Sequence, residues 1–349
     1  MLVMRTSLFR SLVLFYVCLC LATGCGDSSP QGPNGDPSER IVFLSARNGT
    51  SQIFVMDADG SAKTVLSGDA TANYGRLEVS RSTGRVLFTK FGGVGPSGVY
   101  WMQGDGTGIS GPLPDGIEYR WSPDGSRLAF TNNTEGDPVR HVFVVGADGS
   151  GLLQLTTGAE TDESPAWSPD GQKLVFQRSA SGSPGTQLYL VSANSGELTP
   201  LTAGALPSWS PDGSSIGFLR GSDPERGLWT GRADGTPPRQ LSTAACTAKP
   251  PVWSPDGNYL LCIAPSSSGI VLPWSVYRVK ADASESINLT PQGVGIDRYS
   301  WSQVGTKILF DAATAGRSDV YLMDADGTDA LDLTTDPQGA WQPFWIPGT

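Results

Sequence analysis

A short motif, Trp-Ser-Pro-Asp-Gly, recurs along the chain and constrains its fold more than any other feature. Its copies begin at Trp121, Trp167, Trp209 and Trp253, with a degenerate copy at Trp301. Each copy opens a unit of about 44 residues that also contains an Asp-Gly-like turn and, in most cases, a closing Leu-Thr or Leu-Ser pair. The pattern predicts four short strands per unit, joined by two tight turns and one longer loop. Units of this length and strand number are typical of β-propeller blades.

The residue types of the motif explain the first tight turn. Proline sets φ near about −65° at the first corner, aspartate suits the second, and glycine accepts the positive φ that follows. The tryptophan and an aromatic residue nine positions later fall on adjacent strands, as Trp167 and Phe176 illustrate. Because both faces of a propeller blade are covered by neighbouring blades, we expect these aromatic side chains to form the core.

The phenylalanine position of the repeat occurs seven times, which predicts an all-β, seven-bladed β-propeller of four-stranded antiparallel blades. Its copies are Phe43, Phe88, Phe130, Phe176, Phe218, Cys262 and Phe310. The first copy has no tryptophan strand before it, whereas Trp345 near the other terminus keeps the repeat. We therefore expect the strand around Trp345 to pair with residues 41–45, which would leave no open sheet edge. A six-bladed ring with one irregular unit is the alternative.

The repeat resembles that of TolB-type, WD40-like β-propellers. Pro165 to Phe176, Pro207 to Phe218 and Val320 to Thr334 carry the resemblance most clearly, and it extends over nearly all of residues 41–346. The resemblance implies a fold but not a role, because propellers of this type serve many functions.

The amino-terminal residues predict an exported lipoprotein. Arg5 and Arg10 precede an apolar stretch that is shorter than a membrane span, so residues 1–24 fit a signal peptide. The end of this stretch, Leu-Ala-Thr-Gly before Cys25, resembles the lipobox of bacterial lipoproteins, which implies lipidation of Cys25. Residues 25–40 then combine the lipidated cysteine with a polar, flexible tether, and residues 41–349 form the propeller. Multiple acyl chains give a lasting anchor in the cell envelope. Glycine instead of aspartate directly after Cys25 favours the outer membrane.

The charge balance argues against nucleic acid as a partner. The chain has 24 lysines and arginines against 34 aspartates and glutamates, a net charge of −10. Nucleic-acid binding depends largely on contacts from lysine and arginine to phosphates, so a strongly acidic chain is a poor candidate.

Catalytic and metal-binding patterns are also scarce in the sequence. His141 is the only histidine, so neither a multi-histidine metal site nor a Ser-His-Asp triad can be assembled convincingly. We expect no cofactor, no metal and no enzyme activity. Carboxylates near the channel, such as Glu118 and Glu163, would be the acid and base of a hydrolase or lyase if the chain were one. Cys246 and Cys262 remain after processing and form a candidate disulfide in an oxidising compartment.

The predicted topology places the tight turns of every blade on one face of the ring and the longer loops on the other, which we call the long-loop face. The longest of these loops are residues 89–98, 178–186 and 264–274. Loops on a rigid scaffold commonly carry function, so we expect a partner to bind there. The candidate binding residues are Arg76, Glu118, Arg120, Glu163, Lys249, Trp274, Asp297, Arg298 and Trp341. The favoured function is a monomeric, non-catalytic interaction scaffold for envelope proteins, with cell-wall glycan as the alternative ligand.

Overall fold

The structure is a computed structural model that describes residues 39–46, 49–133, 138–180, 185–221, 225–244, 246, 249–265, 274–290, 295–314, 316–335 and 338–347. The expected signal peptide, Cys25 and nearly all of the tether lie outside these residues. No helix within the described ranges is long and apolar enough to cross a membrane.

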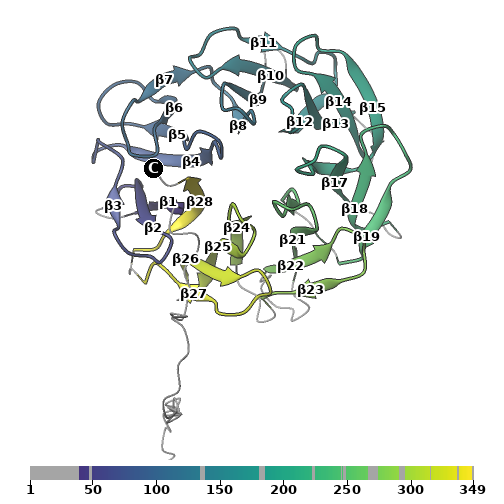
Figure 1. Cartoon of the computed structure of the whole chain (residues 1–349). Coiled ribbons are helices and arrows are strands. Elements are labelled where there is room, and N and C mark those ends of the chain that lie inside the picture. The colour runs from purple at the N-terminus through teal and green to yellow at the C-terminus, as the bar shows by residue number, and fades with distance from the viewer. Residues whose placement is uncertain are drawn as a thin grey trace, which may run out of the picture. The chain divides into compact units, whose positions relative to one another are not determined.

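Seven four-stranded antiparallel sheets are arranged in a ring (Figure 1). We number the sheets as blades 1 to 7 and give each from its innermost strand outward. Blade 1 contains β28 (Trp341–Pro347), β1 (Glu39–Ser45), β2 (Gln52–Asp57) and β3 (Thr64–Val65); blade 2 contains β4 (Asn73–Val79), β5 (Val86–Phe91), β6 (Gly98–Met102) and β7 (Ser110–Leu113). Blade 3 contains β8 (Ile117–Trp121), β9 (Arg127–Asn133), β10 (Arg140–Gly146) and β11 (Leu153–Gln154); blade 4 contains β12 (Thr161–Trp167), β13 (Lys173–Ser179), β14 (Thr186–Ser192) and β15 (Leu198–Ala203). Blade 5 contains β16 (Ala205–Trp209), β17 (Ser215–Arg220), β18 (Gly227–Arg232) and β19 (Arg239–Ser242); blade 6 contains β20 (Val252–Trp253), β21 (Tyr259–Pro265), β22 (Trp274–Lys280) and β23 (Ser286–Asn288); blade 7 contains β24 (Gly295–Trp301), β25 (Lys307–Thr314), β26 (Arg317–Asp324) and β27 (Leu331–Asp332). The prediction of seven blades is confirmed, and the six-bladed alternative is wrong.

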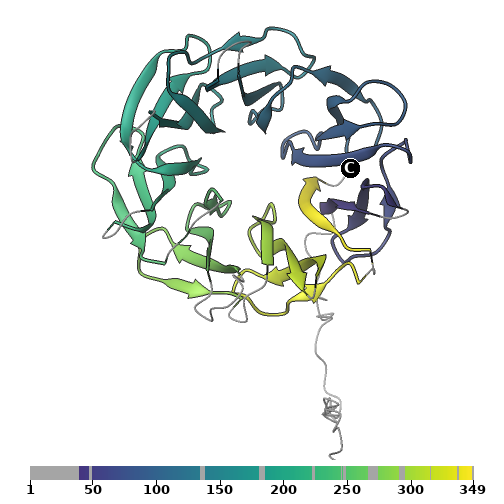
Figure 2. The ribbon, with the colours of Figure 1, turned by 180° about the vertical axis from the view of Figure 1, so that it is seen from behind.

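The ring closes through blade 1, which is built from both ends of the described chain. The yellow strand β28 lies beside the purple strand β1 in both views (Figures 1 and 2). The two strands are antiparallel, with Ile41 opposite Trp345 and Val42 opposite Phe344, which confirms the expected closure. Strand β1 begins at Glu39, earlier than the expected start at residue 41. The reason is that Glu39 is also held in place, because its Oε1 accepts a hydrogen bond of 2.7 Å from the Gln303 amide.

The core lies between the blades, as the aromatic pattern predicts. The seven copies of the phenylalanine position are all buried, with at most 4% of their surface exposed. Trp167 and Phe176 of blade 4 pack in one cluster with Ala129 and Val142 of blade 3. The two faces of each sheet are therefore covered by its neighbours, and an isolated blade would expose both of them.

The motif tryptophans also link neighbouring blades through polar contacts. Four indole Nε1 atoms donate to a main-chain carbonyl on the innermost segment of the preceding blade. The pairs are Trp167 with Arg120 at 3.0 Å, Trp209 with Ala166 at 3.2 Å, Trp253 with Ser208 at 3.3 Å and Trp301 with Val252 at 3.1 Å. The indole nitrogen of Trp121 is buried and has no hydrogen-bond partner among the described residues.

The Ser-Pro-Asp-Gly turns are stabilised by their aspartates. In blade 3 the Ser122 hydroxyl donates to Asp124 Oδ1 at 2.6 Å, and the Ser126 amide donates to the same oxygen at 3.0 Å. These donors stabilise the ionised carboxylate and lower the pKa of Asp124 to about 2, with the Ser122 hydroxyl as the largest cause. The turn aspartates therefore have a structural role.

Blade 6 contains a disulfide between Cys246 and Cys262, whose Cα atoms are 5.8 Å apart. Cys262 occupies the phenylalanine position on β21, and both cysteines are buried. The bond ties the segment before the innermost strand of blade 6 to the strand that follows.

The indole hydrogen bond can be isolated with two matched variants. Trp253 and Trp121 are each 8% exposed, but only Trp253 donates to a carbonyl. Because both Trp→Phe changes remove the same atoms, we expect Trp253→Phe to lower the free energy of unfolding by about 1 kcal/mol more than Trp121→Phe. Urea unfolding monitored by fluorescence measures the difference. Equal losses in the two variants would show that the inter-blade hydrogen bond contributes nothing.

Candidate binding site at the mouth of the central channel

The innermost strands share a β-bulge close to the long-loop face. The register shifts between Gly75 and Glu78 in β4, and at the equivalent place in four other innermost strands: β8, β12, β16 and β24. The pairing of β28 with β1 contains the same irregularity. In five blades one non-glycine residue of the bulge has a positive φ, and these residues are Arg76 (49°), Glu118 (54°), Ser164 (54°), Leu206 (52°) and Gln342 (52°). Bulges re-aim side chains, and left-handed non-glycine residues cluster at functional sites.

Side chains of adjacent blades hold the bulges in place. Glu118 Oε2 accepts a hydrogen bond of 2.8 Å from the Ser164 amide, across the boundary between blades 3 and 4. Gln177 Oε1 accepts one of 2.9 Å from the Leu206 amide, between blades 4 and 5. These contacts satisfy backbone donors that the bulge removes from the strand ladder, and they fix the spacing of the blades around the channel.

Asp311 makes the equivalent connection where the ring closes. Its carboxylate is 2% exposed and accepts amide hydrogen bonds from Asp297 at 3.0 Å, Arg298 at 2.6 Å and Gln342 at 2.8 Å. Burial raises the pKa of Asp311, and the three amide donors act against that rise. Gln342 in turn accepts a hydrogen bond of 3.2 Å from the Leu77 amide of blade 2. Blades 7, 1 and 2 are thus joined in series.

Each blade has two residues at or next to its innermost strand that lie at fixed offsets from its tryptophan position. We call the residues three positions before it the mouth collar: Gln342, Arg76, Glu118, Ser164, Leu206, Pro250 and Arg298. We call the residues one position before it the channel collar: Phe344, Glu78, Arg120, Ala166, Ser208, Val252 and Ser300. Members of both collars line two adjoining hollows of about 250 and 360 Å³. The hollows share five lining residues: Glu78, Arg120, Lys249, Pro250 and Arg298.

Only some of the cations around the hollows are neutralised by the chain itself. Arg120 Nη1 lies 3.6 Å from Glu78 Oε2, and Lys249 Nζ lies 2.7 Å from Asp297 Oδ1. Arg76 is exposed and has no ion pair or side-chain hydrogen bond within the described part of the chain.

Arg298 is held differently. Its guanidinium carbon lies 5.2 Å from the centre of the Phe344 ring, and its Nε is buried without a hydrogen-bond partner among the described residues. The aromatic face orients the guanidinium group, which has no carboxylate partner among the described residues.

The structure brings six of the nine predicted binding residues together. These are Arg76, Glu118, Arg120, Lys249, Asp297 and Arg298, which all line one or both hollows. The other three do not line them. Glu163 forms an ion pair with Arg140 of blade 3, and Trp274 and Trp341 are partly buried against inter-blade clusters.

Other lining residues were not singled out in the sequence. Arg81 occupies the position of proline in the first turn of blade 2, and its Nη2 reaches the Trp301 carbonyl at 3.4 Å. Leu206, Pro250 and Phe344 line the hollows as collar members. The sequence shows that these residues lie at a constant offset from the tryptophan position. It does not show that side chains at this offset face the hollows, because that depends on the β-bulge.

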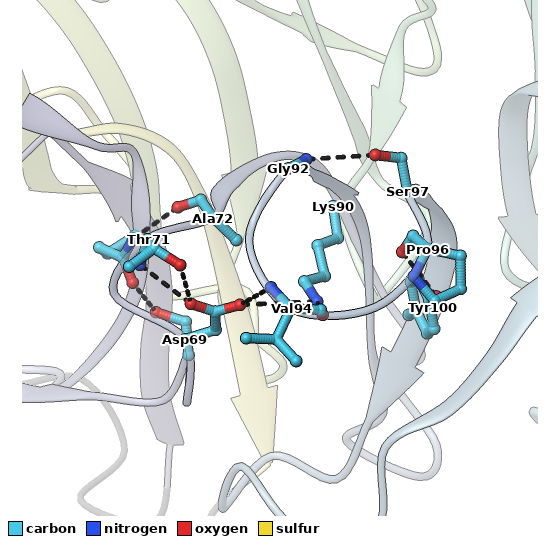
Figure 3. Close-up of polar contacts among 11 residues, drawn as sticks. Asp69, Thr71, Ala72, Lys90, Gly92, Val94, Pro96, Ser97 and Tyr100 are labelled. Carbon is cyan, nitrogen blue, oxygen red and sulfur yellow. Dashed lines mark hydrogen bonds and ion pairs between the residues drawn. The ribbon is translucent and has the colours of Figure 1, made fainter.

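A separate hollow of about 270 Å³ is lined in part by the loop between β5 and β6, whose polar contacts are drawn in Figure 3. Asp69 pins this loop, because its Oδ2 accepts a hydrogen bond of 2.7 Å from the Val94 amide and lies 3.7 Å from Lys90 Nζ. Hydrogen bonds, above all from the Thr71 hydroxyl, lower the pKa of Asp69 to about 2. The charged groups at this hollow are thus engaged with the loop itself, and its floor consists of core aromatics, including Phe88.

No group of three or more histidine, cysteine, aspartate or glutamate side chains in the described ranges could hold a metal ion. The channel mouth therefore offers guanidinium, ammonium and carboxylate groups and apolar side chains as its means of recognition.

Comparison with known families supports the origin of the repeat. The family model described as the TolB beta propeller domain matches residues 116–289. The chain contains a TolB-type β-propeller. No curated protein sequence matches this chain.

Solved structures share the fold of this TolB-type propeller at low sequence identity. TolB from Acinetobacter baumannii is 15% identical with a TM-score of 0.57, covering 90% of this chain and 68% of TolB. An oligogalacturonate lyase in complex with manganese is 17% identical with a TM-score of 0.60, covering 83% and 82%. A puromycin hydrolase is 17% identical with a TM-score of 0.65, covering 88% of this chain and 55% of the hydrolase. At these identities the likeness concerns the fold alone.

The role of Asp311 in closing the TolB-type propeller can be tested by truncation. Asp311→Ala leaves three amide donors without their acceptor, so we expect the free energy of unfolding to fall by about 3 kcal/mol. Asp297→Ala removes an exposed carboxylate from the same region and should change it by less than about 1 kcal/mol. Denaturant unfolding of the two variants provides the comparison. If Asp311→Ala were no less stable than Asp297→Ala, the closure would not depend on this carboxylate.

Proposed function

We propose that this TolB-type propeller is a non-catalytic envelope lipoprotein that binds a partner protein at the channel mouth on its long-loop face. One observation carries the proposal: charged side chains from four different blades converge on the two adjoining hollows. A ring of blades linked by hydrogen bonds holds them in a fixed arrangement, and preorganised groups bind at a lower entropic cost.

The contacts of the candidate catalytic acids support a role in binding rather than in chemistry. Glu118 accepts hydrogen bonds from the Ser164 amide and, at 3.3 Å, from the Thr131 hydroxyl. Glu163 pairs with Arg140 and accepts a hydrogen bond of 3.3 Å from Gln177. Both carboxylates are therefore engaged by donors of the chain itself, whereas a general acid or base must be placed to exchange a proton with a substrate.

The lining of the hollows favours a peptide segment over a glycan. Leu206, Pro250, Pro343 and Phe344 supply small apolar surfaces next to charged groups, as in sites that take extended peptides. Trp274 and Trp341, the two tryptophans among the candidate binding residues, are partly buried against inter-blade clusters and line neither hollow. Glycan binding therefore lacks the aromatic platform that motivated it.

The binding proposal can be tested by site-specific photo-crosslinking in intact cells. A photoreactive residue at Asp297, whose side chain is 55% exposed beside the mouth, should give a reproducible protein adduct. The same residue at Thr236, in a tight turn on the opposite face, should not. The adduct from position 297 should weaken when Arg298→Ala is added. Equal adducts from both positions, or none from position 297, would contradict the proposal.

The membrane anchor is tested separately at Cys25. Lipidation adds acyl chains that partition strongly into membranes, so the protein should sediment with the envelope fraction. In Cys25→Ser it should appear in the soluble fraction and lose labelling by a radioactive fatty acid. The neighbouring change Ser28→Ala serves as the control and should leave both results unaltered. A Cys25→Ser protein that stayed labelled and membrane-bound would rule out this anchor.

A further inference from the structure

We infer that the channel mouth recognises an acidic peptide segment, whose carboxylates bind to Arg76 and Arg298. This inference rests on the proposed function, because it names the chemistry of the segment that the mouth would hold. Three observations support it. The residues around the hollows include more cations than anions, the anions already have partners within the chain while two arginines have no carboxylate partner among the described residues, and the charged residues are concentrated on one side of the ring.

The sign of the charge around the hollows is opposite to that of the whole chain. The chain has a net charge of −10. The residues that line the two hollows include five cations, Arg76, Arg81, Arg120, Lys249 and Arg298, and three anions, Glu78, Glu118 and Asp297. A cationic recess in an acidic protein concentrates anionic ligands at the recess, because the potential is focused by the low-dielectric walls.

The anions of the mouth are already engaged within the chain. Glu118 accepts the Ser164 amide at 2.8 Å, Asp297 pairs with Lys249 at 2.7 Å, and Glu78 faces Arg120 at 3.6 Å. Arg76 and Arg298 are left without a carboxylate partner among the described residues. The cationic groups of the mouth that remain without a carboxylate partner among the described residues therefore include these two guanidinium groups.

The two guanidinium groups suit a carboxylate in particular. Both line the larger hollow, and they come from blades 2 and 7, the neighbours of blade 1 on either side. Phe344 lies below the Arg298 guanidinium and restricts its orientation. Arginine binds carboxylates through paired, charge-assisted hydrogen bonds, and holding its plane beforehand reduces the entropic cost of doing so.

The collar positions of the two blades on the opposite side carry no charge. Blades 4 and 5 contribute Ser164, Leu206, Ala166 and Ser208 to the two collars. An extended segment across the mouth would thus meet guanidinium groups on one side and small neutral side chains on the other. This contrast favours a peptide in which acidic residues are separated by small or apolar ones, over a uniformly charged polymer.

The inference can be tested by fluorescence anisotropy with the full propeller. The probe is a labelled peptide of alternating glutamate and alanine, and its matched control replaces every glutamate with glutamine. We expect the glutamate peptide to bind at least about tenfold more tightly, and its binding to weaken as salt is raised. Arg76→Ala and Arg298→Ala should each weaken binding by about tenfold, whereas Arg298→Lys should recover only part of the loss.

A control variant separates local recognition from net charge. Arg232→Ala removes one cation beside the tight-turn aspartate Asp234, on the opposite face, and should leave the affinity unchanged. Thermal unfolding should be unaltered in Arg76→Ala, because this exposed side chain has no partner among the described residues. Equal binding of the glutamate and glutamine peptides, or equal losses in Arg232→Ala and Arg76→Ala, would overturn the inference. Tighter binding of a polygalacturonate oligomer than of the glutamate peptide would overturn it as well, in favour of an acidic glycan.

The two proposals can fail independently. A protein adduct from position 297 together with indifference to glutamate would leave a partner-binding mouth and remove the acidic segment. Selective glutamate-peptide binding with no adduct in cells would support the chemistry of recognition and count against a protein partner for this mouth.

Discussion

The structure depends above all on the pairing of β28 with β1, because this contact joins the two ends of a chain whose blades cannot stand alone. Each sheet presents apolar side chains on both faces, and only neighbouring sheets cover them. Without the closing strand, β1 would become the innermost strand of a three-stranded blade, and the faces of blades 7 and 2 that pack against Trp345 and Ile346 would lose part of their cover. The free energy of unfolding of the whole ring therefore depends on the antiparallel pairing of β28 with β1.

Polar contacts also join neighbouring blades on both faces of the ring, the tight-turn face and the long-loop face. On the tight-turn side, Arg85 Nη1 donates a hydrogen bond to the Gly125 carbonyl of the next blade. The guanidinium carbon of Arg85 also lies 4.4 Å from the centre of the Trp101 ring. On the long-loop side, carboxylate and amide side chains such as Glu118 and Asp311 take up the backbone donors of the bulges. The left-handed residues of the bulges are intrinsically unfavourable and persist because these neighbours hold them. The mouth is thus rigid because the elements that shape it also bind the blades together.

The sequence predicts the parts of this molecule that repeat. The Trp-Ser-Pro-Asp-Gly turns, the buried phenylalanine position and the closing strand all follow from one period and from turn chemistry that has few solutions. Six of the predicted mouth residues also line the hollows, since the segment entering an innermost strand must pass the channel. The bulge could not be predicted, because the residues that adopt positive φ have no common type: Arg76, Glu118 and Leu206 are a cation, an anion and an aliphatic residue.

Trp274 and Trp341 illustrate the limit of arguing from irregularity. Each departs from the repeat, and an aromatic outside the pattern resembles a binding residue when only the sequence is known. In the structure each one begins a strand and is partly buried against an inter-blade cluster, and neither lines the two hollows. The packing of a side chain depends on which strands its neighbours occupy, and that is a property of the closed ring.

The same repeat that builds the scaffold also leaves its collar positions free to vary. A residue three positions before the tryptophan is constrained by its backbone and not by a complementary cavity, so arginine, glutamate, serine, leucine or proline can occupy it. Core positions have no such freedom, since a buried phenylalanine that is replaced by a smaller residue leaves a cavity. Recognition can therefore change at a collar position such as Arg76, whose side chain links no blades among the described residues, whereas Glu118 and Gln342 also join neighbouring blades. In this chain the arginines of the collars lie in blades 7, 2 and 3, and the uncharged residues of blades 4 and 5 lie across the channel. A ring built from near-identical units thus has a mouth that is cationic on one side and uncharged on the other, because its collar residues differ from blade to blade.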